Sequence, residues 1–217
     1  MKYAICRIEK FKSMEKVASA GDHINRLRET PNADHSRPVT ILHGSSDLVG
    51  DVRARLPGKT RSNAVYAVGM LLSASSDWFR EGGSVEDWCD SCLAWLEYRY
   101  GKNCVNVTFH GDELVPHIHA YLVPITANGR LSCDDFFGTP QKLSKLQDDY
   151  ADSMRHLGLQ RGIPRTQTKR RHQHVRRFYE MCNQVESSLD QAKVAKLLHQ
   201  IVSSPKDGKN GLLQKPR

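Results

Sequence analysis

Long apolar runs are missing from this chain. No stretch approaches the roughly 20 consecutive apolar residues that a membrane-spanning helix needs, and no secretory leader opens the sequence. A disulfide framework is also missing, because the six cysteines are scattered through a chain too long to need disulfide staples: Cys6, Cys89, Cys92, Cys104, Cys133 and Cys182. These absences argue against a membrane or secreted protein and predict reduced thiols in the cytoplasm.

One cysteine pair has a spacing that also occurs in metal and redox sites. Cys89 and Cys92 lie in a helical pattern, however, and no second Cys or His pair is near them in the sequence. A structural role for both thiols is therefore the stronger interpretation.

Acidic residues are also unevenly distributed. Lys and Arg exceed Asp and Glu by 32 to 24, which gives a net charge of +8 and a pI near 9.2. No acidic residue lies between Met154 and Tyr179. In that span we expect the following side chains to bind DNA: Arg161, Arg165, Lys169, Arg170, Arg171, Arg176 and Arg177. A solvated basic face without a ligand is the alternative.

The apolar patterns predict a mixed α/β (α+β) architecture in one substantial domain, without internal repeats. Strands are expected over residues 2–11, 103–110 and 117–125, and helices over 47–56, 84–101 and 139–158. Two segments have weaker patterns. Residues 12–30 lose apolar periodicity and turn polar, and residues 59–79 are expected to begin as helix and end as strand.

The two clearest helices carry their own boundary signals. Ser84 and Asp87 resemble a capping box, and Thr139 is expected to cap the later helix. Tryptophans in helical patterns are more often core residues than base-stacking platforms, which predicts a core role for Trp78, Trp88 and Trp95.

Three histidines and two carboxylates surround a proline in HGDELVPHIH, residues 110–119. Side chains alternate along a strand, so His117 and His119 project from one face. If the preceding strand pairs antiparallel, His110 approaches the same face. Three neutral imidazoles bind a divalent transition metal, with Mn, Zn, Co or Ni favoured over Mg, and leave positions open for a substrate oxygen. Ordinary surface or core histidines are the alternative.

The two carboxylates lie in the loop between these strands. Either Asp112 or Glu113 can orient a ligand histidine, accept a proton or complete the metal shell. We assign Glu113 to proton transfer and Asp112 to the support of the ligands.

The sequence resembles a known family at this point. HGDELVPHIH is similar to the H-x-D-E-x-T-P-H-x-H motif of the Mob/Pre (MobV) plasmid mobilisation and recombination relaxases, with Val115 in place of Thr. H-I-N-R at residues 23–26 resembles their H-N-x-R motif, with the Asn displaced to Asn25. Weaker similarity reaches the basic stretch, so the likeness covers about residues 1–180. Residues 181–217 are expected to form a short C-terminal helix, over 187–202, and a flexible tail.

The resemblance implies a central antiparallel sheet of the two-histidine (HUH-like) relaxase type with flanking helices. It also implies a bacterial cytoplasmic enzyme that nicks and reseals one strand of plasmid DNA at an origin of transfer, in single-stranded and hairpin regions. His23 would be the nucleophile, Arg26 and Glu113 would assist it, and His110, His117 and His119 would hold the metal. Manganese is the expected cofactor, with magnesium and zinc as the other choices.

Several alternatives stay open in the sequence. One of the tyrosines could replace His23 as nucleophile. The same histidines could activate water in a metal-dependent nuclease or phosphoesterase, or hold a structural metal in a non-catalytic DNA-binding replication or repressor protein. Self-association is not determined by the sequence.

Overall fold

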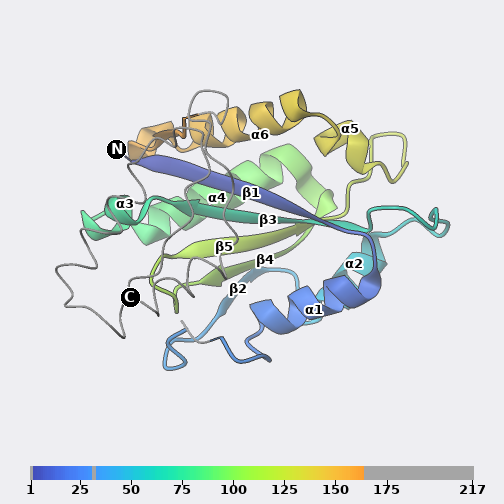
Figure 1. The fold of residues 1–217 in the computed structure, drawn as a ribbon, viewed down its shortest axis with the longest axis horizontal. Coiled ribbons are helices and arrows are strands. Elements are labelled where there is room, and N and C mark those ends of the chain that lie inside the picture. Colours follow the sequence, from blue (N-terminus) through green and yellow to red (C-terminus); the bar gives the residue numbers. More distant parts are fainter. Residues whose placement is uncertain (1, 31–32, 164–217) are drawn as a thin grey trace, which may run out of the picture. The chain divides into compact units, whose positions relative to one another are not determined.

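The computed structural model describes residues 2–30 and 33–163 (Figure 1). Contacts divide the chain into two compact units, Met1–Gly162 and Ile163–Arg217, and the elements below belong to the first. The expected helix over 187–202 and the basic residues from Arg165 onward lie outside the described residues. No helix among those described is long and apolar enough to cross a membrane.

A six-stranded sheet forms the centre of the first unit, in the order β2-β4-β5-β3-β1-β6. Its strands are β1 (Tyr3–Phe11), β2 (Thr40–His43), β3 (Ala67–Ala74), β4 (Cys104–His110), β5 (His117–Leu122) and β6 (Gln160–Arg161). Neighbouring strands pair antiparallel except β1 and β6, which pair parallel. The predicted antiparallel sheet is confirmed, and the predicted hairpin is the pair β4–β5.

Six α-helices flank the sheet: α1 (Met14–Ile24), α2 (Leu48–Arg55), α3 (Ser76–Arg80), α4 (Val85–Tyr100), α5 (Cys133–Phe137) and α6 (Pro140–Ser153). Two 3-10 turns follow α4 and α6, at Gly101–Asn103 and Arg155–Leu157. The predicted caps are confirmed, because Ser84 accepts from the Asp87 N–H and Thr139 from the Lys142 N–H.

One face of the sheet packs on α4 and α6 through an apolar core (Figure 1). Ile118 and Leu122 of β5 meet Trp88 of α4 and Tyr150 of α6 in this core, and all four are essentially buried. Trp78 and Trp95 belong to the same cluster, so the predicted core role of the tryptophans is confirmed. Burial of large apolar side chains here is the main source of stability.

The opposite face packs on α1 and α2 (Figure 1). Its apolar cluster is smaller and includes Val17 and Ile24 of α1, Leu48 of α2 and Tyr121 of β5. Side chains alternate along β5, so His117 and His119 lie on the same face as Tyr121. The histidines therefore point toward the helices that carry this smaller core.

Two sequence expectations need correction. Residues 14–24 form α1, although the sequence showed no apolar periodicity there. The pattern was hard to recognise because only three residues of the helix are buried: Val17, Gly21 and Ile24. Gly21 carries no apolar side chain, yet a Cβ there would lie 3.4 Å from that of Leu48, so the glycine permits the helices to approach.

The second correction concerns residues 59–79. The expected initial helix is absent, and residues 59–66 run as turn and irregular chain before β3. The expected strand ends at Ala74, and the end of the segment belongs to α3. Strand β3 lies in the middle of the sheet and is buried on both faces. Its apolar run therefore lacks the alternation that distinguishes a strand from a buried helix.

Candidate active site

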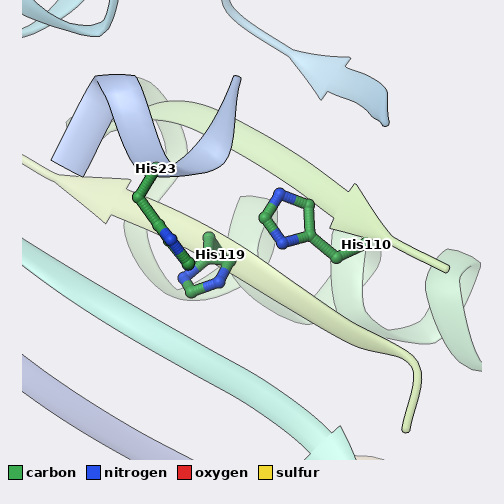
Figure 2. Close-up of side chains that lie close together, drawn as sticks. All are labelled: His23, His110 and His119. Carbon is green, nitrogen blue, oxygen red and sulfur yellow. The ribbon is translucent and has the colours of Figure 1, made fainter. Parts of the chain in front are cut away.

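Four imidazoles converge beside the β4–β5 hairpin (Figure 2 shows three of them). Register pairs His110 at the end of β4 with His117 at the start of β5, and the rings of His110, His117 and His119 have centroids 4.8 to 5.1 Å apart. His23, in the last turn of α1, completes the group at 5.8 Å from the His110 ring and 5.3 Å from the His119 ring. The predicted convergence of the hairpin histidines is thus present.

Hydrogen bonds fix which ring nitrogens are free. His110 Nε2 lies 3.0 Å from the carbonyl oxygen of Ile24, and His117 Nδ1 lies 3.0 Å from that of Val115. A carbonyl only accepts, so each of these nitrogens carries the proton and the other one has a free lone pair. Within residues 2–30 and 33–163, His110 Nδ1 and His119 Nε2 are buried and find no hydrogen-bond partner. Unpaired buried nitrogens of this kind fit a metal site.

Burial favours the neutral form of His23, His110 and His119. Burial lowers the pKa of His110 to about 4, although the hydrogen bond to the Ile24 carbonyl acts in the opposite direction. Burial, followed by the charges of neighbouring histidines, lowers the pKa of His119 well below its usual value. Burial also lowers the pKa of His23, and the positive charge of Arg26 acts in the same direction. Neutral imidazoles are the form that binds a metal or attacks phosphorus.

Two overlapping groups of ligand atoms are close enough for one ion. The ligand atoms of His23, His110 and His119 lie within 4.8 Å of one another, and so do those of His110, Glu113 and His117. His110 belongs to both. The predicted triplet of His110, His117 and His119 is therefore divided between the two groups. His23 lies as near to His119 as a ligand of the same ion would.

Arg26 joins the end of α1 to the hairpin loop. Its Nε and Nη2 donate to the two carboxylate oxygens of Asp112 at 2.7 and 2.9 Å, and Nη2 also donates to Glu113 Oε1 at 2.7 Å. The Arg26 and Asp112 side chains are 9% and 2% exposed, so this ion pair is largely shielded from water. The hydrogen bonds from Arg26 keep the pKa of Asp112 below its usual range.

The backbone of Arg26 is left-handed, with φ of 55°. Its N–H donates to the His23 carbonyl and the Leu27 N–H donates to that of Asp22, which is the Schellman pattern at a helix C-terminus. Glycine is usual at this position, and a side chain there costs about 1 kcal/mol. The ion pairs with Asp112 and Glu113 hold Arg26 in this conformation.

Some polar residues beside the site were not foreseen. Asn106, Thr108 and His110 alternate along β4 and so share one face, and Asn106 and Thr108 are fully buried. Thr108 donates to Asn106 Oδ1, and Ser73 of β3 donates to the Pro116 carbonyl beside His117. Polar residues at every second position of N-V-T-F-H were the available signal.

The predicted DNA-binding residues are not at this site as far as the structure describes them. Arg161 lies on β6, at the opposite edge of the sheet from β2 and β4. Its guanidinium donates to Asp148 Oδ1 at 2.8 Å and to the carbonyl of Gly162.

Curated relatives match most of this chain and extend beyond it. A 65 kDa protein of Zymomonas mobilis subsp. mobilis is 37% identical over 194 residues, which are 83% of this chain and 33% of the relative. The plasmid recombination enzyme type 3 of Staphylococcus aureus is 29% identical over 197 residues, 82% of this chain and 48% of the relative. The chain thus spans about a third to a half of the length of these relatives.

A solved relaxase domain shares the fold. The MobM relaxase domain, Mn-bound and in complex with a 22-nucleotide origin-of-transfer DNA of plasmid pMV158, has a TM-score of 0.71 at 22% identity; the match covers 82% of this chain and 99% of that one. The family profile Mob_Pre, described as plasmid recombination enzyme, matches residues 1–180. This chain therefore belongs to the Mob_Pre family of plasmid recombination enzymes.

Proposed function

We propose that this chain is a relaxase that binds a plasmid origin of transfer, nicks one strand with a histidine nucleophile, stays attached to the 5′ phosphate and later reseals the break. The observation that carries this proposal is the convergence of His23 with His110, His117 and His119, of which His110 and His119 each have a buried ring nitrogen without a hydrogen-bond partner among the described residues. The family supports it, because its curated members are named plasmid recombination enzymes.

His110, His117 and His119 would hold the divalent metal. The lowered pKa values and unpaired nitrogens of His110 and His119 match that function, and Mn is the first choice because the MobM domains are Mn-bound, with Mg and Zn as the other ions to test. A bound divalent ion would supply positive charge next to a non-bridging phosphate oxygen. Asp112 keeps the loop between the ligands in place through Arg26.

His23 would supply the attacking nitrogen. Its neutral ring forms an N–P bond to the scissile phosphorus while the P–O3′ bond breaks, and the leaving 3′ oxygen takes up the proton that the imidazole loses. Glu113 would carry that proton: it binds Arg26, lies 4.0 Å from His117 Nε2, and is near enough to His23 for its charge to oppose the lowering of the His23 pKa by burial. The N–P bond keeps the energy of the cleaved ester, and attack by the 3′ hydroxyl restores the strand without ATP.

Arg26 would act on the nucleophile and on the phosphate. Its charge lowers the pKa of His23 and so favours the neutral ring. Its Nη1 is buried and has no hydrogen-bond partner among the described residues, and a phosphate oxygen that reached this nitrogen would satisfy it.

The test is incubation with a supercoiled plasmid that carries the DNA flanking this chain's own gene, with and without Mn²⁺. Denaturing gels before and after protease treatment separate free nicks from protein-linked ones. A nick whose 5′ end shifts on protease treatment supports the relaxase, whereas a protein-free nick indicates a nuclease that activates water.

A second candidate function rests on the closeness of His23 to the other rings. If His23 is a fourth ligand, the ion is closed off and has a structural role in a DNA-binding protein. Metal affinity decides between them, since a ligand histidine is needed for metal binding and a nucleophile is not.

DNA contacts by the basic residues are also part of the proposal. Replacing Arg170 and Arg171 together by Ala should weaken binding to all DNA sequences alike and reduce the slope of log affinity against log salt by up to about two units. Fluorescence anisotropy at several salt concentrations measures this. An unchanged slope would indicate that these residues, which lie outside the described part, form a solvated basic face without a ligand.

The cytoplasm is the proposed site of action. A plasmid substrate is located there, and the cysteines that the structure describes are all free thiols.

A further inference from the structure

The end of α1 is attached to the rest of the molecule at three consecutive residues. The Ile24 carbonyl accepts from His110, the Asn25 side chain donates to the Ser46 carbonyl at 2.7 Å, and Arg26 binds Asp112. The contacts of Ile24 and Arg26 reach the β4–β5 hairpin and its loop. The contact of Asn25 reaches the loop between β2 and α2. The proposed relaxase chemistry gives this contact no role.

That loop is organised by one carboxylate. Asp51 of α2 accepts from the Ser45 N–H and the Ser45 hydroxyl, both at 2.9 Å, and from Asn106 Nδ2 at 2.9 Å. Asn106 also donates to the Ser45 carbonyl at 2.7 Å. Ser45, the neighbour of Ser46, is thus hydrogen-bonded through its N–H, its hydroxyl and its carbonyl.

The loop fits closely against β4. Gly44 has φ of +82°, and a Cβ there would lie 2.5 Å from the Val105 carbonyl oxygen and 2.8 Å from Asp51 Oδ2. Only glycine allows this approach without displacing the backbone. The loop therefore has one well-defined position relative to β4, and its Ser46 carbonyl is a fixed acceptor.

We propose that Asp51 is a positioning residue for the nucleophile: it fixes the loop at residues 44–46, and the loop fixes His23 through Asn25. This inference rests on the proposed function, because it assigns His23 as nucleophile. A hydrogen-bonded path runs from the buried Thr108 and Asn106, beside the metal ligands, through Asp51 and Ser45 to the end of α1. Asn25, the displaced Asn of the H-I-N-R motif, connects this path to α1 by its hydrogen bond to the Ser46 carbonyl.

This path is buried at Thr108 and Asn106 and exposed at Ser45 and Ser46, and its role is orientation. It adds little net stability, since each bond replaces one to water, but Ser45 is held at its N–H, hydroxyl and carbonyl at once, which defines the position of the loop. In-line attack on phosphorus needs the imidazole at a defined distance and angle, and a misplacement of about 1 Å can cost on the order of 10²-fold in rate. Loosening the loop should therefore slow attack more than it weakens binding.

The experiment uses the full chain with Mn²⁺ and the supercoiled plasmid described above. Asp51→Ala and Asn25→Ala should each slow single-turnover adduct formation about tenfold, with DNA affinity and Mn²⁺ affinity unchanged. The double variant should be no slower than the slower single variant, because both changes interrupt the same path. Asn25→Ala removes an exposed contact and should keep the fold.

Asp47→Ala is the matched control. Asp47 caps α2 from the same loop by accepting from the Gly50 N–H at 2.9 Å, so its loss lowers the Tm but leaves the bonds between Asp51, Ser45 and Asn106 intact. Its adduct rate should match the wild type. An equal slowing in Asp47→Ala would show that stability alone matters, and would overturn the inference.

Amide hydrogen exchange supplies a readout that does not need activity. The Arg26 and Leu27 amides donate within the helix end, and Asp51→Ala should make them exchange on the order of tenfold faster, whereas Asp47→Ala should not. If the wild-type protein forms no adduct, the relaxase function fails and the exchange rates still decide whether Asp51 orders this turn. Unchanged exchange and an unchanged adduct rate in Asp51→Ala would refute the positioning role.

Discussion

The two faces of β5 carry opposite chemistry within six residues. Toward α4 and α6, Ile118 and Leu122 are 0% and 1% exposed in an apolar core. Toward α1, His117 and His119 lie among ring nitrogens, an ion pair and a row of buried polar side chains. One face excludes polar groups, whereas the other gathers them.

This difference shows how one strand can serve both folding and chemistry. The apolar face supplies stability roughly in proportion to the area that it buries. The histidine face holds groups whose burial is unfavourable unless each has a partner, and it keeps nitrogens of His110 and His119 unpaired. Changes on the first face should therefore affect stability, and changes on the second should affect chemistry.

The largest effect is expected at His23. His23→Ala should abolish the covalent adduct and leave affinity for Mn²⁺ and for DNA within about threefold, because a nucleophile contributes to bond formation and not to metal binding. The adduct of the wild type, a phosphoramidate, should break in mild acid, whereas a phosphotyrosine would survive. Gel analysis after acid treatment and titration calorimetry with Mn²⁺ measure both properties.

Each contrary result has its own meaning. An acid-stable adduct, or one that persists in His23→Ala, would move the nucleophile to a tyrosine. Loss of Mn²⁺ binding in His23→Ala would make this histidine a ligand and favour the structural-metal alternative.

A pair of neighbours on β5 compares the faces directly. His119→Ala should slow nicking on the order of 10³-fold or more through loss of a metal ligand, with DNA binding largely intact. Ile118→Val should lower the free energy of unfolding by about 1 kcal/mol and leave nicking unchanged. Wild-type nicking by His119→Ala would show that the metal assignment is wrong.

Two ion pairs near the end of α1 extend the comparison to stability. Arg26→Ala leaves Asp112 as a buried charge without its partner and should cost about 3 to 5 kcal/mol in urea unfolding. Arg28→Ala removes an exposed pair with Asp22, with side chains 59% and 38% exposed, and should cost less than about 1 kcal/mol.

Glycine at position 26 tests the strained backbone separately. Arg26→Gly should be about 1 kcal/mol less destabilising than Arg26→Ala, because glycine adopts the left-handed conformation freely. If Arg26→Ala were the more stable of the two, the strain at this position would be disproved.

The sequence predicted those parts of the molecule whose signals are local. The hairpin and its histidines followed from alternation and a short loop, and the α4 and α6 boundaries followed from Ser84 and Thr139. Helix α1 was missed because its buried stripe includes Gly21, which packs well only because Leu48 of another helix lies against it. The role of Arg26 in binding Asp112 was also missed, since 86 residues separate them and only the fold brings them together.

A small effect is expected on the apolar face, where Tyr150 makes buried polar contacts. The Tyr150 hydroxyl accepts a hydrogen bond from Trp88 Nε1 at 3.2 Å in the core between the sheet and helices α4 and α6. Tyr150→Phe leaves the indole N–H without this acceptor, so the free energy of unfolding should fall by about 1 to 2 kcal/mol.

The chemistry should not change in this variant. Tyr150 is fully buried in the core on the other face of the sheet from the histidines, so the adduct should form at the wild-type rate although a tyrosine hydroxyl has been removed. Urea unfolding and the plasmid gel, run on the same preparation, measure the two quantities together. A lost adduct with intact folding would contradict both the separation of the two faces and the assignment of His23, because it would make a core tyrosine the attacking group.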